Sequence, residues 1–305
     1  MITLIENFRA AFYAPFYAAA ALGAYSDEGL EVRIVKSSDA AQTIPSLVAG
    51  GGEVSWGGPM RLMGALERTL ESGLAVFCEV VGRDPFFLIG RTPNPGFKLA
   101  DLERISFAPV SEVPTPWMCL QQDIRLAGLD PQRVRTLEGR SMPENAHALR
   151  NGDVDVIQIF HPYARSLVEE GAGHVWYAAA RRGPTSYTTL NTTRQFIRGN
   201  PKAVLGMCRA MYRTQRWIAA HTGEDLARVV SSYFPGISIS LLATSYTEYK
   251  QLRIWNDQPT VSRSGFEWLR EAGLANGRIR QRYSFEECVD STIAERVILE
   301  TPEPL

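Results

Sequence analysis

The feature that most constrains this fold is the alternation of strand-like and helix-like segments over the first 190 residues. Short runs of apolar and β-branched residues each precede a stretch with helical spacing, which is typical of strands joined by helices. Strands are expected at 2–6, 30–35, 53–56, 105–108, 133–137, 154–160 and 175–177. Helices are expected at 14–22, 41–49, 59–70, 115–127, 144–150 and 162–169. This order predicts an α/β fold with mixed, mostly parallel sheets that are flanked by helices.

The chain changes character near Phe196, and the later patterns are mainly helical. An amphipathic helix expected at 201–220 carries Val204, Met207 and Met211 on its apolar side. Shorter helices are expected at 224–232, 241–252, 262–272 and 285–297. The sequence therefore predicts additional C-terminal helices after the strand-bearing part.

Charge and cysteine content narrow the classes of function. The chain has 305 residues and a formal net charge of -1, so we expect no nucleic-acid partner. No apolar run approaches the ~20 residues that a membrane helix needs, so we expect no membrane insertion. The four cysteines, Cys78, Cys119, Cys208 and Cys288, form no CxxC pair and fit no metal template. We therefore expect neither a metal nor a cofactor.

Four short motifs carry a resemblance to a known family. They are Gly23-Ala24-Tyr25-Ser26-Asp27-Glu28-Gly29-Leu30-Glu31-Val32, Gly152-Asp153-Val154-Asp155, His161-Pro162-Tyr163-Ala164 and Gly199-Asn200-Pro201-Lys202-Ala203. In order and spacing, over about residues 1–235, they resemble the solute-binding proteins of ABC transporters for nitrate, sulfonates, taurine and the pyrimidine precursor of thiamine. The match is weaker in any single motif than in their order.

The resemblance implies a two-lobed periplasmic binding protein of type II. Residues 1–90 and 187–305 would form lobe I with the helical C-terminal part, and residues 91–186 would form lobe II. Two crossover strands near 86–91 and 187–191 would act as the hinge. The ligand would lie in a cleft between the lobes and would be held by hinge closure.

The loops that follow the expected strands are rich in aromatic residues, which favours a flat ligand. Gly57 and Gly58 would let the backbone approach that ligand, and the helix start at Thr115 offers backbone N–H groups. The candidate ligand-binding residues are Arg9, Phe12, Tyr13, Trp56, Gly57, Gly58, Phe86, Glu112, Thr115, Trp117, Phe160, His161, Tyr163 and Tyr187. An aromatic side chain near a strand end is more often part of the core than a ligand contact, and Trp56, Trp117 and Tyr163 are the strongest candidates for contact. Arg9 can equally belong to a local ion pair, and Glu112 can equally be a solvated charge.

We expect a binding protein without catalytic residues that captures a pyrimidine-like or other aromatic heterocycle, with a sulfonate as the second choice. The related pyrimidine synthase needs a lysine and a histidine where this chain has Pro59 and Met63. The alternative is a cytosolic enzyme on the same fold, such as a desulfinase or an aromatic-acid decarboxylase. Cys78 and Cys119 would be its only thiols near the site. A regulatory effector-binding domain is disfavoured because no room remains for a helix-turn-helix.

Partners and compartment follow from the same resemblance. If a signal peptide has been removed, the protein is periplasmic and delivers its ligand to an ABC-transporter permease. Otherwise it is cytoplasmic. We expect a monomer in either case.

Overall fold

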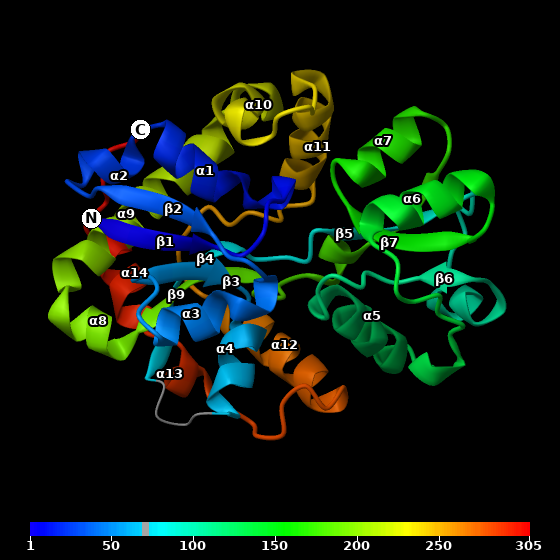
Figure 1. The fold of residues 1–305 in the computed structure, drawn as a ribbon, viewed down its shortest axis with the longest axis horizontal. Coiled ribbons are helices and arrows are strands. Elements are labelled where there is room, and N and C mark those ends of the chain that lie inside the picture. The colour runs from blue at the N-terminus through cyan, green and yellow to red at the C-terminus, as the bar shows by residue number, and fades with distance from the viewer. Residues whose placement is uncertain (69–72) are drawn as a thin grey trace. The chain divides into compact units, whose positions relative to one another are not determined.

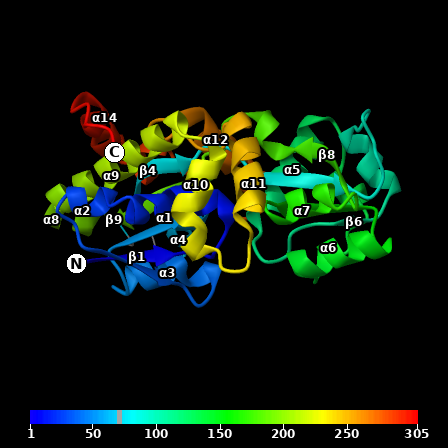
Figure 2. The same cartoon turned by 90° about the horizontal axis from the view of Figure 1, so that it is seen from above.

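The computed structural model describes residues 1–68 and 73–305 and divides them into two units (Figure 1, Figure 2). Unit 1 comprises Met1–Arg83 and Gly183–Leu305, and unit 2 comprises Asp84–Arg182. Residues 69 and 70 of the helix expected at 59–70 lie outside the described residues. The chain thus passes between the units at two places, near 83/84 and 182/183.

Unit 1 is built on a sheet with the strand order β2-β1-β3-β9-β4. Its strands are β1 (Ile2–Glu6), β2 (Val32–Lys36), β3 (Val54–Gly57), β4 (Leu74–Val81) and β9 (Thr188–Thr193). Strand β1 pairs in parallel with β2 and β3, whereas β9 runs antiparallel between β3 and β4. The carboxyl ends of β1 and β3 therefore meet at the edge of the sheet where β9 begins.

Helices cover both faces of this sheet (Figure 1). One group is α1 (Ala14–Ala21), α2 (Ala24–Asp27), α9 (Pro201–Ala220) and α10 (Gly223–Val230). The other group is α3 (Thr43–Val48), α4 (Pro59–Leu66), α12 (Arg263–Ala275) and α13 (Phe285–Cys288). The remaining helices of unit 1 are α8 (Arg194–Gly199), α11 (Ile239–Gln251) and α14 (Ser291–Leu299). The long helix expected at 201–220 is confirmed, with a proline at its first turn and a buried apolar stripe.

Unit 2 has its own sheet, with the strand order β6-β7-β5-β8. Its strands are β5 (Phe86–Gly90), β6 (Phe107–Ala108), β7 (Val156–Phe160) and β8 (His174–Ala178), and its helices are α5 (Thr115–Leu126), α6 (Met142–Asn151) and α7 (Tyr163–Glu169). Strand β5 is antiparallel to both β7 and β8, and β6 is parallel to β7. A core that includes Leu102, Phe107 and Leu120 fills the unit.

The predicted α/β class with two mixed sheets is confirmed, but parallel pairing does not dominate in the described strands. The antiparallel pairs arise because β9 and β5, which follow the passages between the units, enter each sheet against their neighbours. The strand expected at 133–137 was wrong: Pro131–Arg133 forms a 3₁₀ turn, and only Thr136 bridges to Phe107. The helix expected at 285–297 is interrupted at Val289, which is extended and bridges to Val76.

Candidate functional site

The residues that follow β1 and β3 gather at one edge of the unit 1 sheet. Ligands of open α/β sheets bind beyond the carboxyl ends of parallel strands, so this edge is the first place to look for a site. Asn7 follows β1, and its amide Nδ2 donates to the hydroxyl of Tyr13 at 3.1 Å. Gly57 and Gly58 follow β3 and lead into helix α4. We call this group, together with Arg61 and Asn191, the strand-end cluster.

Arg61 lies in the first turn of α4 and is the cation of the strand-end cluster. Its Nη1 donates to the backbone carbonyl of Ala40 at 2.6 Å. No carboxylate forms an ion pair with Arg61 in the part of the chain that the structure describes. A Cβ atom on Gly57 would lie 3.4 Å from Arg61 Cδ and 3.8 Å from Asn191 Nδ2, so Gly57 keeps open the space between these two side chains. The remaining guanidinium donors can therefore bind an anion.

Burial shapes the electrostatics around Arg61. Burial lowers the pKa of Arg61, and nearby Tyr13, Tyr187 and Asp39 act in the opposite direction. Burial also raises the pKa of Tyr13 to about 12, although the positive charge of Arg61 opposes this shift. Tyr13 thus keeps its proton at neutral pH, and the only full charge that these two residues bring is positive.

Four of the predicted aromatic residues come together in unit 1. The ring centroids of Phe12 and Tyr13 are 4.3 Å apart, those of Phe12 and Tyr187 6.2 Å, and those of Tyr13 and Trp56 5.9 Å. Trp56 is fully buried and stacks on Phe16 with a centroid separation of 4.5 Å. This stacking shows that Trp56 is a core residue. Its indole Nε1 has no acceptor among the described residues.

Gly58 is required by close packing against the start of β9. A Cβ atom at this position would lie 2.7 Å from the carbonyl oxygen of Tyr187, inside van der Waals contact. The carbonyl oxygen of the preceding Gly57 accepts from Thr189 Oγ1 at 3.0 Å and from Asn191 Nδ2 at 3.2 Å. These contacts fix the loop at which the Gly57-Gly58 pair before the helix predicted a close approach of the backbone.

Arg9 is held by the protein itself. Its Nε and Nη2 donate to the two carboxylate oxygens of Glu6 at 2.6 and 2.8 Å, and its Nη1 donates to the carbonyl of Tyr233 at 2.7 Å. The guanidinium also lies 4.9 Å from the ring centroid of Tyr17. These contacts leave Arg9 less available to a ligand than Arg61.

Four of the predicted residues lie at the end of β7 in unit 2. The ring centroids of Phe86 and Phe160 are 5.3 Å apart, and those of Phe160 and Tyr163 are 5.9 Å apart. His161 is buried against Phe87, with ring centroids 4.5 Å apart. Of the rings at this strand end, Tyr163 is the exposed one, with 37% of its surface accessible.

The other predicted residues of unit 2 belong to its helix starts. Glu112 Oε1 accepts the backbone N–H of Met142 at 2.6 Å, so this carboxylate caps α6. Thr115 is the first residue of α5. Trp117 packs on Phe107 with a centroid separation of 5.3 Å, at the rim of the core. These contacts give Glu112 and Trp117 structural roles.

Sequence reasoning missed Arg61 and Asn191. Arg61 sits on an amphipathic helix, where an arginine is most often a solvated charge. The available signal was its position two residues after Pro59 in the Gly-Gly-Pro helix start, at the end of a strand. Asn191 could not be placed without knowing that β9 pairs with β3.

The cysteines of the enzyme alternative are buried. Burial raises the pKa of Cys119 well above its usual value, which disfavours the thiolate that a nucleophile needs. Pro59 is the first residue of α4, and Met63 is buried within it. Across residues 1–68 and 73–305, no cluster of three or more metal-binding side chains is found. Among the described helices, none combines the length and the apolar character needed to cross a bilayer.

The chain is similar to a protein family, to a curated protein and to solved structures. Residues 95–231 match the model of the NMT1-like family. YtlA of Bacillus subtilis, named as a candidate binding protein, is 22% identical over 98% of this chain and 90% of its own length. The periplasmic aliphatic sulphonate-binding protein SsuA of Escherichia coli superposes with a TM-score of 0.74 at 14% identity, over 93% of this chain and 95% of SsuA.

A second similar structure is a mutant of DszB in complex with biphenyl-2-sulfinic acid, with a TM-score of 0.69 at 14% identity over 98% of this chain and 99% of DszB. The resemblance drawn from the sequence motifs is confirmed at the level of the fold. Residues 95–231 are similar to the NMT1-like family, and the chain has the fold of the periplasmic binding proteins.

Proposed function

We propose that this protein is the solute-binding component of an ABC-type importer and that it binds a small organic anion, a sulfonate or a carboxylate, with a flat or apolar body. The observation that carries the proposal is Arg61. Its guanidinium is largely enclosed at the carboxyl ends of β1 and β3, bonds only to a backbone carbonyl, and has no carboxylate partner among the described residues. A sulfonate or carboxylate head group is the natural acceptor for its remaining donors.

The rest of the strand-end cluster supports the same ligand class. The Tyr13 hydroxyl and the Asn191 amide are neutral polar groups near the arginine, and the rings of Phe12 and Tyr187 adjoin them. The binding-protein names of YtlA and SsuA agree with transport, and the periplasm is the corresponding compartment. A neutral pyrimidine-like heterocycle, which the aromatic loops alone favoured, would leave Arg61 without an anion.

Isothermal titration with alkyl and aryl sulfonates, the matching carboxylates, and neutral pyrimidines tests the proposal. We expect the anions to bind and the substitution Arg61→Leu to weaken them about 10- to 100-fold, because a charge-assisted hydrogen bond contributes ~1.5–3 kcal/mol. Arg33→Leu is the matched control, since Arg33 lies exposed on β2. Tight binding of neutral pyrimidines that is unaffected by Arg61→Leu would reject the anion assignment.

The expectation of hinge closure also stays a proposal. A ligand that binds one conformation better shifts the population toward it. Small-angle scattering with a saturating sulfonate should then give a smaller radius of gyration than the free protein. An unchanged radius with a tightly bound ligand would argue against closure.

A further inference from the structure

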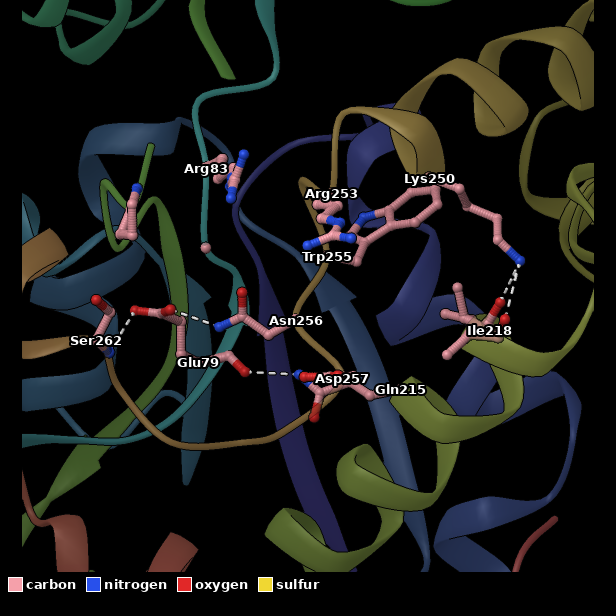
Figure 3. Close-up of a pocket in the computed structure, with 13 residues that line it drawn as sticks. Glu79, Arg83, Gln215, Ile218, Lys250, Arg253, Trp255, Asn256, Asp257 and Ser262 are labelled. Carbon is pink, nitrogen blue, oxygen red and sulfur yellow. Dashed lines mark hydrogen bonds between the residues drawn. The ribbon is translucent and has the colours of Figure 1, made fainter. Parts of the chain in front are cut away.

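Unit 1 contains a cavity that shares no lining residue with the strand-end cluster (Figure 3). Its volume is about 530 Å³, which lies within the range of small-molecule sites. The walls come from the end of β4, from α9 and α11, and from the segment 253–262. We call it the β4 cavity.

Gln215, on α9, provides a buried acceptor in the wall of the β4 cavity. Only 1% of the residue is exposed. Its Nε2 donates to the backbone carbonyl of Glu79 at 2.8 Å, as Figure 3 shows, and this bond fixes the direction of the amide. Its Oε1 has no donor among the described residues. Buried polar atoms are almost always paired, so this oxygen indicates a missing donor from a bound molecule.

The carboxylate of Glu79 is the second acceptor. Glu79 is fully buried, and its oxygens accept from Asn256 Nδ2 at 2.5 Å, from the backbone N–H of Ser262 at 3.2 Å, and from the hydroxyl of Ser186. A carboxylate can accept about four hydrogen bonds. One position therefore remains for a donor from the cavity.

Two arginines of the cavity wall are available for an anionic group. Arg83 and Arg253 form no ion pair within the described residues, whereas the ammonium of Lys250 is taken up by the carbonyls of Ile218 and His221. The φ of Arg253 is 53° because this residue lies just past the end of α11, where the N–H groups of Arg253 and Ile254 donate to the carbonyls of Lys250 and Tyr249.

The wall of the cavity also has an apolar part. Trp255 is 9% exposed, and its Nε1 donates to the carbonyl oxygen of Phe12 at 2.8 Å. Ile218 and Pro184 add further apolar surface. These side chains would contact the apolar part of a bound molecule.

We propose that the β4 cavity binds a small zwitterionic amino acid. Its ammonium would lie at Gln215 Oε1 and the Glu79 carboxylate, and its carboxylate would bind Arg83 and Arg253. The two ends of such a molecule match the two kinds of unsatisfied group in the wall. This site is independent of the anion site at Arg61.

Thermal-shift screening with the twenty L-amino acids, followed by titration calorimetry on any that stabilise the protein, tests the proposal. n-Butylamine and butyrate serve as probes that each lack one charged end. We expect saturable binding of at least one amino acid, at least tenfold tighter than either probe. Arg253→Ala and Gln215→Leu should each weaken this binding at least tenfold.

Two further variants locate the effect. Arg33→Ala is the control for a lost exposed arginine and should leave amino-acid binding unchanged, and so should Arg61→Leu. Absence of binding by every amino acid would overturn the proposal. So would equal binding by n-butylamine, retention of affinity in Arg253→Ala, or loss of affinity in Arg61→Leu, which would place the ligand in the strand-end cluster instead.

Discussion

Glu79 predicts a specific dependence of stability on pH. Burial raises the pKa of Glu79 to about 7 from an ordinary value near 4.5, even though Ser186, Asn256 and Ser262 donate to its carboxylate. The folded protein therefore holds this proton more tightly than the unfolded chain does. As the pH rises from about 4.5 to 7, the unfolded chain loses the proton first, and the free energy of unfolding falls. Between pH 5 and pH 8 the fall amounts to about 2.5 kcal/mol.

The substitution Glu79→Gln isolates this effect because glutamine does not titrate. Its amide can keep the oxygen that faces Ser262 and can donate to Asn256 once the Asn256 amide is rotated. Urea unfolding at several pH values should show the wild type losing, relative to Glu79→Gln, about 2–3 kcal/mol between pH 5 and pH 8.

Glu295→Gln serves as the control, since Glu295 is exposed on α14. Its difference from the wild type should stay within about 0.5 kcal/mol at every pH. A difference between wild type and Glu79→Gln that is flat across this range would refute the reasoning, because it would mean that Glu79 has the same pKa in both states.

Three further substitutions test the packing that holds each unit. Arg182→Met should lower the free energy of unfolding by about 3–5 kcal/mol in urea titrations, because it removes the cation that pairs with the buried carboxylates of Asp84 and Asp123. An effect below about 1 kcal/mol would contradict this expectation. Gly58→Ala should destabilise by about 1–3 kcal/mol through its contact with the Tyr187 carbonyl. Gly64→Ala, in α4 with no atom within 4 Å of its Cβ position, should instead stabilise the protein by up to about 1 kcal/mol in the same urea titrations.

Much of the architecture could be predicted from the sequence because local periodicity specifies it. Strands β1 and β3 and the long helix α9 lie where alternation and helical spacing placed them. Strand β4 was not predicted, because it is buried at all eight positions and shows no alternation. The break at Val289 also had no local signal, since it depends on a bridge to Val76, more than two hundred residues away in the chain.

The candidate site was predicted less completely, because its residues come from distant parts of the chain. The aromatic character of the loops could be seen in the sequence, and Phe12, Tyr13 and Tyr187 do lie together. The sequence could not show whether Arg9 or Arg61 is available to bind a ligand, because this depends on their tertiary contacts. Arg9 is saturated by Glu6, three residues before it, whereas Arg61 finds only a backbone carbonyl.

The central claim is that Arg61 binds the anionic head group of the ligand, and a crystal structure with a bound alkyl or aryl sulfonate tests it most directly. We expect sulfonate oxygens within hydrogen-bonding distance of the Arg61 guanidinium, beyond the ends of β1 and β3. A sulfonate that is bound with full occupancy elsewhere, with Arg61 still bonded only to the Ala40 carbonyl, would contradict it.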